Sequence, residues 1–491
     1  MADQDKNSKV TVPKTPKKKR QIFLPVFVGI VTFLAGVALT LMVVFAFLGR
    51  SLQPQSSSFS KINSVYQTIK QNYYKPVSST KLINGAINGM IASLDDPFSE
   101  YLPKEDATDL NTTISGSFGG IGASVKQDGN YVAVDAPVKN TPAAKAGLKT
   151  NDVIIKINGK SAKGFTTSEV VSKIRGKIGT KVKLTLKRGT KIFTVTLTRA
   201  KIPVTTVSGK LDATDKTVGY IQISTFSEPT AKELKQQVKK LRKKGATKFI
   251  IDLRGNPGGT LPTALATASM FLKDGQTIMK VQDRSGNTET YKAGKTYDNG
   301  FKVKEKTVVL VDGDSASASE IFASALKESA HDQIIGTQSY GKGTVQTVSD
   351  LGSSSEMKIT TAKWLTPKGH WINKKGVTPT VKADYPSYAY LSGFDTSKTY
   401  QLGQSSRTII SIQKILKALG YSVDQTNGVY DESTQAAVAQ FQTAQSNDDS
   451  GALSATGTVD PATGEALIEA LSQLISDHDQ AYQTAVNELN K

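Results

Sequence analysis

A serine lies among small residues in Asp314-Ser315-Ala316-Ser317-Ala318-Ser319-Glu320, and a lysine lies between two glycines in Tyr340-Gly341-Lys342-Gly343-Thr344-Val345-Gln346. The chain of 491 residues contains no cysteine and only three histidines, so thiol nucleophiles are absent and the usual bases are scarce. A lysine amine can act as a general base when burial lowers its pKa enough to leave it neutral for part of the time. The two segments therefore predict a hydrolase with Ser317 as nucleophile and Lys342 as base.

Strands and helices alternate on the amino-terminal side of these segments. Strands are expected at 217–224, 249–253 and 308–311, and helices at 228–244 and 261–271. This alternation is typical of an α/β core with parallel or mixed strand pairing. We therefore expect the loops at the strand ends to carry the catalytic groups.

A glycine-bearing loop at 254–259 follows the second of these strands. Backbone N–H groups of Gly258 or Gly259, with the amide of Ala318 directly after the serine, are expected to form an oxyanion hole for a tetrahedral intermediate. A glycine-rich loop after a strand also suggests phosphate binding. This loop lacks the G-x-x-x-x-G-K-[ST] pattern, so we favour the oxyanion hole.

Three further polar residues lie near the predicted pair in the sequence. Gln346 follows Lys342 by four positions, and on a strand such positions face the same side, so Gln346 is expected to orient the amine. Glu320 follows Ser317 by three positions. His331 falls at an expected helix end, so a Ser–His arrangement is the weaker alternative. Taken alone, a serine at a helix start usually caps the helix, and most lysines are solvated surface charges.

Short strands separated by glycine, asparagine and aspartate turns cover about 112–200. Within them, Phe118-Gly119-Gly120-Ile121-Gly122 resembles the carboxylate-binding loop of PDZ domains, and the segments 143–148 and 152–159 strengthen this resemblance. Consecutive glycines let N–H groups converge on a carboxylate, and an exposed strand edge accepts an added peptide strand. We therefore expect these five residues to bind the carboxyl-terminal tail of a protein substrate.

The amino-terminal part of the chain predicts a membrane anchor. Residues 22–48 contain no charge and would extend about 40 Å as a helix, which is enough to cross a bilayer. Basic residues at 17–20 place the cytoplasmic tail 1–21 inside the cell. A cleaved signal peptide is the alternative, but the apolar run is too long and lacks a clear cleavage site. A helical region at 55–110 is then expected outside the cell.

Charge is distributed unevenly along the chain, whose formal net charge is +20. The excess of positive charge lies before residue 401, and residues 401–491 carry a net negative charge. No arginine-rich arm or RNA-binding aromatic motif accompanies this excess, so nucleic acid is not an expected partner. Attraction to anionic lipids or cell-wall polymers is the more specific interpretation of the basic surface.

A small helical domain is expected near the carboxyl terminus. A linker at 389–404 precedes it, and apolar residues then recur at helical spacing from 409 to 419. The pattern over 405–475 resembles the three-helix peptidoglycan-binding domain of cell-wall enzymes, with helices free of an internal repeat and a polar insert at 447–454. The tail at 476–491 receives no assigned role.

The core resembles the carboxyl-terminal processing (tail-specific) serine proteases. Segments matching this family occur in the family's order at 94–102, 116–122, 252–259, 315–321 and 341–346. The resemblance implies that Ser317 is the nucleophile, Lys342 the general base and Gln346 its orienting partner. It also implies that the PDZ domain recruits substrate tails and gates access to the site. Glu320 matches an acidic residue of the motif.

We therefore predict a multidomain α+β protein. It would comprise an N-terminal transmembrane helix, a PDZ-like β-rich domain, an α/β serine protease core at 201–388 and a small all-α C-terminal domain. The predicted function is that of a single-pass membrane endopeptidase of a Gram-positive bacterium, cleaving extracytoplasmic proteins near their C-termini beside peptidoglycan. No cofactor or metal is expected, and assembly into a homo-oligomer is left open.

Two other classes of function are weaker alternatives. A non-catalytic adaptor would use the PDZ and wall-binding domains only for binding, against which the complete set of Ser317, Lys342 and Gln346 argues. A peptidoglycan hydrolase would need a metal site or a placed pair of carboxylates. The three histidines, His331, His370 and His478, are scattered in the sequence and indicate no metal site.

Overall fold

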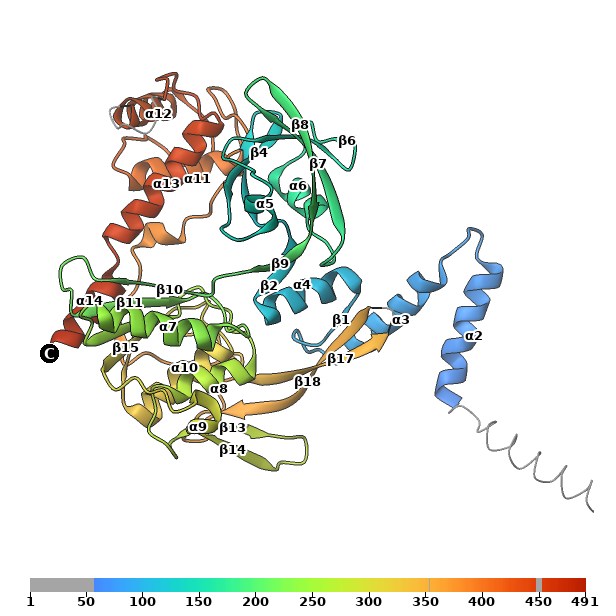
Figure 1. The fold of residues 1–491 in the computed structure, drawn as a ribbon, viewed down its shortest axis with the longest axis vertical. Coiled ribbons are helices and arrows are strands. Elements are labelled where there is room, and N and C mark those ends of the chain that lie inside the picture. The colour runs from blue at the N-terminus through green and yellow to red at the C-terminus, as the bar shows by residue number, and fades with distance from the viewer. Residues whose placement is uncertain (1–56, 353, 447–452) are drawn as a thin grey trace, which may run out of the picture. The chain divides into compact units, whose positions relative to one another are not determined.

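The computed structural model describes residues 57–352, 354–446 and 453–491. It divides into two compact units, 1–90 and 91–491. The described part of the first unit contains α2 (Ser57–Asn72) and most of α3 (Ser79–Ala92), which Figure 1 shows in blue. The predicted anchor at 22–48 lies outside the described residues. Within the described ranges, no helix is both long and apolar enough to cross a membrane.

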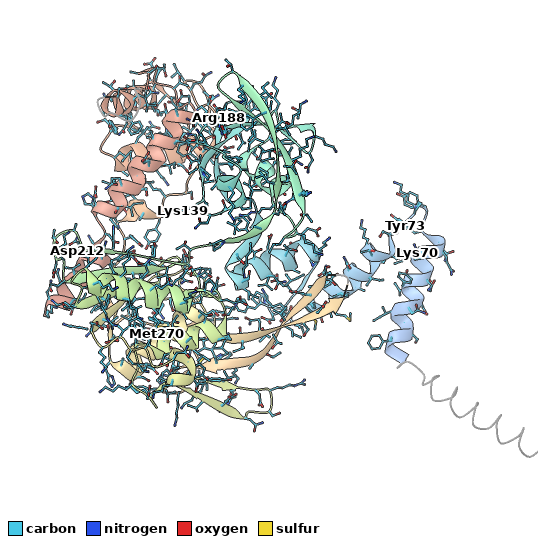
Figure 2. The ribbon with its side chains drawn as sticks, viewed as in Figure 1. Lys70, Tyr73, Lys139, Arg188, Asp212 and Met270 are labelled. Atoms are coloured by element: carbon cyan, nitrogen blue, oxygen red, sulfur yellow. The ribbon has the colours of Figure 1, made fainter. Side chains whose placement is uncertain are left out.

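The PDZ domain is built on a sheet with the strand order β3-β4-β5-β7-β8. Its strands are β3 (Ala123–Asp128), β4 (Tyr131–Pro137), β5 (Val153–Ile157), β7 (Lys181–Arg188) and β8 (Lys191–Thr198). Alternate side chains of these strands form a buried apolar cluster with α6 (Thr167–Ile174). Arg188, labelled in Figure 2, forms an ion pair with the buried Asp152 at 2.6 Å. Among the described residues, β3 pairs only with β4, so its other edge accepts no strand along the side of the sheet where α6 packs.

The protease core contains a mixed six-stranded sheet with the order β10-β11-β12-β15-β16-β19. The strands are β10 (Val207–Leu211), β11 (Val218–Ile223), β12 (Lys248–Asp252), β15 (Lys306–Val311), β16 (Gln333–Gly336) and β19 (Val381–Lys382). Only β10 pairs antiparallel, and every other neighbour is parallel. The expected α/β alternation is therefore present, and the ends of β12 and β15 lead into the two predicted catalytic loops.

Helices pack on both faces of this sheet (Figure 1). One face, which includes Phe249, Ile251 and Val309, packs against α7 (Thr230–Lys243), α8 (Leu261–Ser269) and α10 (Ala318–Ala325). The alternate strand residues, including Ile250 and Leu310, pack against Ala481, Ala485 and Leu489 of α14 (Gln480–Asn490). The tail that received no role from its sequence is thus a helix that covers the protease sheet. Its Tyr482 hydroxyl donates to Asp212, labelled in Figure 2, at 2.6 Å.

A second sheet lies beside the core and carries the predicted base. Its strands are β1 (Glu100–Leu102), β13 (Thr277–Gln282), β14 (Thr288–Lys292), β17 (Thr344–Gly352) and β18 (Ser355–Leu365). The long strand β18 pairs with β17 along one edge and with β1 and β13 along the other. Lys342 therefore lies two positions before β17, which pairs with β18 at an edge of this sheet.

The carboxyl-terminal domain contains α11 (Arg407–Ala418), α12 (Glu432–Gln445) and α13 (Pro461–Asp477) around one apolar cluster. The expectation of repeat-free helices is wrong. Two buried glutamines, Gln413 and Gln442, each donate to a loop carbonyl and a threonine hydroxyl and accept a glycine N–H, with sequence separations of 16, 21 and 15 residues in both cases. The sequence carries this repeat as Gly428 and Gly457, each followed by a helix-capping aspartate. The other side chains of the two segments differ, which made the repeat hard to recognise.

Candidate active site

Ser317 lies at a sharp turn between β15 and α10. It is the N-cap residue of α10, is half-buried, and has a positive φ of 54° with ψ of −111°. A non-glycine residue in such a conformation costs on the order of 1–3 kcal/mol, and residues of this kind cluster at active sites. The strained backbone therefore makes Ser317 a candidate functional residue independently of its sequence motif.

The buried carboxylate of Glu320 joins the serine turn to the lysine loop. Its Oε2 accepts the N–H of Ser317 at 2.8 Å and the N–H of Lys342 at 2.9 Å. Its Oε1 accepts the N–H of Gly341 at 2.7 Å and the hydroxyl of Ser339 at 2.5 Å. A single side chain thereby brings together two backbone positions that the sequence separates by 25 residues, and it assigns Glu320 the structural role that its motif left undefined.

The backbone of the lysine loop is fixed from its other side. Both tryptophans of the chain donate to it: Trp364 Nε1 to the carbonyl of Lys342 and Trp371 Nε1 to the carbonyl of Gly343, each at 2.8 Å. A Cβ atom on Gly341 would lie 2.8 Å from the backbone nitrogen of Lys375. The glycines around Lys342 are therefore needed because neighbouring chain packs directly on the loop.

The amine of Lys342 is held differently from its backbone. Its Nζ lies 4.8 Å from the centroid of the Phe98 ring, and among the described residues it makes no hydrogen bond or ion pair, including with Ser317. Burial lowers the pKa of Lys342 below its ordinary value of 10.5, and the charge of Lys358 adds to this effect. The carboxylates of Asp96, Glu100 and Glu320 oppose the shift. The net lowering of the pKa suits a general base.

Gln346 lies on β17, and its side chain contacts threonines. Its Nε2 donates to Thr344 Oγ1 at 2.9 Å and to Thr360 Oγ1 at 3.1 Å. Among the described residues, no hydrogen bond joins it to Lys342. Sequence reasoning did not identify Thr360, because this residue lies on the partner strand β18 and carries no motif.

The glycine loop packs directly on the serine turn. A Cβ atom on Gly258 would lie 2.9 Å from the Cβ of Ser317 and 2.9 Å from the nitrogen of Ala318. The N–H of Gly258 donates to the side chain of Asn256 at 2.9 Å, so it is already occupied. Within the described chain, the N–H groups of Gly259 and Ala318 donate to no protein group. These two remain available as donors to an oxyanion.

Side-chain hydrogen bonds hold the two catalytic loops to each other. Ser315 Oγ donates to the carbonyl of Leu253 at 2.8 Å, and Ser319 Oγ donates to the carbonyl of Asn256 at 2.9 Å. The side chain of Asn256 is itself fully buried and donates to Ile223 at 2.7 Å. The three serines of the small-residue segment therefore differ, since Ser315 and Ser319 bond to the glycine loop and Ser317 is the candidate nucleophile.

A buried ion-pair network ties the same glycine loop to α14. The side chain of Arg254, only 7% exposed, pairs with Asp252 at 2.6 Å and with Asp479 at 2.8 Å. Burial alone would lower the pKa of Arg254, but hydrogen bonds to the two carboxylates raise it above its ordinary value. Asp479 also caps α14 by accepting the N–H of Tyr482. A capping aspartate before apolar residues at helical spacing was the signal in the sequence that would have identified this helix.

The predicted tail-binding residues lie at the start of the PDZ domain. Phe118, Gly119 and Gly120 belong to β2 (Ser117–Gly120), which pairs with β9 (Ala200–Pro203), and Ile121 and Gly122 connect β2 to β3. The guanidinium of Arg175, at the end of α6, lies 4.1 Å from the centroid of the Phe118 ring. The segment therefore leads directly into the free edge of β3, where an added strand would begin.

Comparisons with known proteins agree with this arrangement. The model of peptidase family S41 matches residues 217–383. The models described as the activating protease CtpB N-terminal domain, a PDZ domain and a putative peptidoglycan binding domain match 48–106, 119–198 and 405–467.

Two curated proteins and one solved structure illustrate the similarity. The carboxy-terminal processing protease CtpA of Bacillus subtilis (strain 168) is 43% identical over 477 residues, which cover 96% of this chain and 99% of that protein. A probable CtpA-like serine protease of Staphylococcus saprophyticus is 36% identical over 499 residues, covering 100% of this chain and 97% of that protein. The solved structure of a photosystem II D1 C-terminal processing protease is 32% identical and covers 67% of this chain and 87% of its own, with a TM-score of 0.40.

Proposed function

The chain belongs to peptidase family S41, as a carboxy-terminal processing serine protease with a PDZ domain, and from this membership we propose that Ser317 and Lys342 are its catalytic pair. The predicted family, enzyme class and multidomain α+β organisation are thereby confirmed. The observation that carries the proposal is the Glu320 carboxylate, which accepts the N–H groups of both Ser317 and Lys342. The assignment of individual residues to catalytic steps goes beyond family membership.

In the proposed mechanism, the neutral amine of Lys342 accepts the proton of the Ser317 hydroxyl as Oγ attacks the scissile carbonyl. The resulting oxyanion accepts hydrogen bonds from the N–H groups of Ala318 and Gly259. The carbon–nitrogen bond then breaks, and the lysine proton passes to the leaving amine. Water, deprotonated by the same amine, releases the acyl group as a new carboxyl terminus and regenerates Ser317.

The proposed pair needs one adjustment before it can react. Since no hydrogen bond joins Lys342 Nζ to Ser317 in the described structure, the amine must turn from the Phe98 ring toward the serine. The carbonyl of Lys342 is fixed by Trp364, so the movement is confined to the side chain. We attribute to Gln346 the role of orienting the amine after this turn.

Substrate capture is proposed to begin at the PDZ domain. The free edge of β3 can accept a peptide as an added strand, and the segment 118–122 lies where the peptide carboxylate would fall. The substrates in this proposal are proteins with accessible carboxyl-terminal tails, which are cut after capture.

Location is proposed from the two ends of the chain. The uncharged run at 22–48, preceded by basic residues, supports a single-pass anchor with the protease outside the cell. The match at 405–467 supports attachment to peptidoglycan. Together they support a proposed location between the membrane and the wall, where the substrates would be secreted or membrane proteins.

The test is a comparison of protein carboxyl termini in cells carrying wild-type protein or Ser317→Ala. We expect a set of trimmed termini in the wild type that is full-length in the variant, whose PDZ domain should still bind tail peptides. Ser324→Ala, which removes a buried serine of α10 whose hydroxyl donates to the carbonyl of Ile321 within the helix at 3.2 Å, is the matched control and should retain trimming. Identical termini in wild-type and Ser317→Ala cells would refute the assignment, and binding without cleavage by the wild type would favour the adaptor.

A further inference from the structure

The segment 96–99 lies against the predicted base, although it precedes the PDZ domain in the sequence. It leads into β1, whose Glu100 lies opposite Lys358 of β18. The other edge of β18 pairs with β17, which begins two positions after Lys342. The pairing of these three strands therefore places the segment 96–99 beside the lysine side chain.

Hydrogen bonds fix this segment and connect it to Gln346. Asp96 accepts the hydroxyl of Ser99 at 2.6 Å and the N–H of Phe98 at 3.1 Å. The buried Ser99 hydroxyl accepts the N–H of Thr360 at 3.0 Å, and the hydroxyl of Thr360 accepts the Gln346 amide at 3.1 Å. Phe98 thus lies between the anchored residues Asp96 and Ser99. Ser99 bonds to Thr360, the threonine that also accepts the Gln346 amide.

The half-buried Phe98 ring is the group that the structure places next to the lysine amine. Its centroid is 4.8 Å from Lys342 Nζ, within the range of a cation–π contact. The described residues offer this amine no hydrogen bond or ion pair. A partly buried lysine without a polar partner is unusual, since buried charges are ordinarily paired.

We propose that Phe98 is a positioning residue for proteolysis, whose ring holds the amine of Lys342 beside the active site and excludes water from it until the amine turns to Ser317. This inference rests on the proposed role of Lys342 as the general base. It assigns a part in catalysis to a residue of the segment 94–102, which matches the family but received no assigned role.

A ring suits this task better than a carboxylate. A carboxylate in direct contact would form an ion pair and stabilise the ammonium form, which cannot accept a proton. The ring attracts the amine more weakly, excludes water by its bulk, and leaves no hydrogen bond to break when the lysine turns. The Asp96 carboxylate is nearby but is occupied by Ser99 and the N–H of Phe98.

The other charges near Lys342 come from three elements. Lys358 on β18 lowers the pKa of Lys342, while Glu100 on β1 and Glu320 on α10 raise it together with Asp96. Glu100 and Lys358 form an ion pair with each other, so their effects partly cancel. Replacing Phe98 leaves all four charges in place, and a change in the pH profile would therefore report the loss of the ring.

The test measures kcat and kcat/KM of the full chain on fluorescently labelled, unfolded casein across a range of pH, for Phe98→Ala, Phe98→Leu and Phe98→Tyr. In Phe98→Ala, water reaches the amine, so we expect kcat to fall by about 10- to 100-fold and the acid limb of kcat/KM to move up by about one pH unit. Phe98→Leu keeps apolar cover without a ring face, so kcat should fall while the limb does not rise. Phe98→Tyr should restore both quantities.

Controls separate this inference from the proposed function. Phe301→Leu removes a ring with a comparable contact, 5.1 Å from Lys235, and should leave the limb unmoved. If Lys342→Met is inactive while Phe98→Ala and Phe98→Leu match the wild type, the positioning role is overturned and the base assignment stands. The positioning role is also overturned if kcat falls in Phe98→Ala and Phe98→Leu, is not restored in Phe98→Tyr, and the acid limb of kcat/KM stays in place. If Lys342→Met retains activity, the base assignment itself is overturned. Should Phe98→Ala fail to fold, the Leu and Tyr variants decide between these outcomes.

Discussion

The backbone at Ser317 and the side-chain amine of Lys342 differ in how the protein holds them. The serine turn is fixed by a buried carboxylate and by the packing of Gly258, while its flanking serines bond to the glycine loop. The lysine amine has only the face of the Phe98 ring, although the backbone of Lys342 is as firmly held as that of the serine.

This difference indicates where the enzyme can be controlled. The proposed nucleophile and the N–H groups of the proposed oxyanion hole are already held by the fold, so we expect little reorganisation of them when the substrate binds. The lysine side chain must still move, and a lysine has several rotatable bonds and a pKa that responds strongly to burial. We therefore expect control of activity to act on the proposed base more readily than on the proposed nucleophile.

The largest effect is expected from disturbing the backbone around Ser317. In Gly258→Ala the new methyl group would lie within 2.7–2.9 Å of the backbone of residues 316 and 318 and of the Ser317 Cβ, at a φ of 103° that disfavours alanine. We expect kcat to fall by at least about 100-fold, comparable to the loss of an oxyanion donor. Steady-state kinetics on labelled casein measures this.

Gly255→Ala is the matched control, because Gly255 also has a positive φ but no atom within 4 Å of the place that the new methyl group would take. It should lose only the stability that a strained backbone costs, about 1 kcal/mol, and keep most of its activity. Equal activities of the two variants would contradict the close approach of the glycine loop to the serine.

The site residues that could be predicted from the sequence are those whose proposed role is local. Ser317, Lys342 and the glycines at 258–259 lie in motifs whose small residues are required by the close packing that the structure shows. Phe98, Thr360 and Asp479 were missed as contributors, since each reaches the site through strand pairing or helix docking across the chain. Such pairings depend on tertiary packing, which spacing within one segment does not encode.

A smaller effect is expected from Glu320→Gln, which alters the connection between the serine turn and the lysine loop. The buried carboxylate accepts four hydrogen bonds, and a side-chain amide would turn one acceptor into a donor facing N–H or O–H groups. Leaving such groups unpaired costs about 1–3 kcal/mol each, so we expect the free energy of unfolding in urea to fall by about 2–4 kcal/mol. Glu328→Gln makes the same change at a half-buried glutamate that accepts one backbone N–H and contacts His370, and should cost less than about 1 kcal/mol. Equal losses would mean that Glu320 does not join the two loops.

The smallest expected effect is a gradual change of kcat/KM with pH. It depends on the side-chain amine of Lys342 alone. Because burial lowers the pKa of Lys342 below 10.5, a neutral base is available at lower pH than for a free lysine. Below that pKa, kcat/KM should fall tenfold per pH unit with a one-proton slope. The unfolded chain keeps the lysine proton up to 10.5, so the same group makes the folded state more stable as pH rises between its lowered pKa and 10.5.

Two measurements check this sign. Rates of casein cleavage from about pH 6 to about pH 10 should give one acid limb, and unfolding in urea over the same range should show a pH dependence that Lys342→Met reduces. A histidine base would instead give a limb near its own ordinary pKa, about 6.5, and this limb would vanish in His331→Gln. A limb that is unaffected by His331→Gln and lies above that of histidine would locate the pH dependence in the lysine amine.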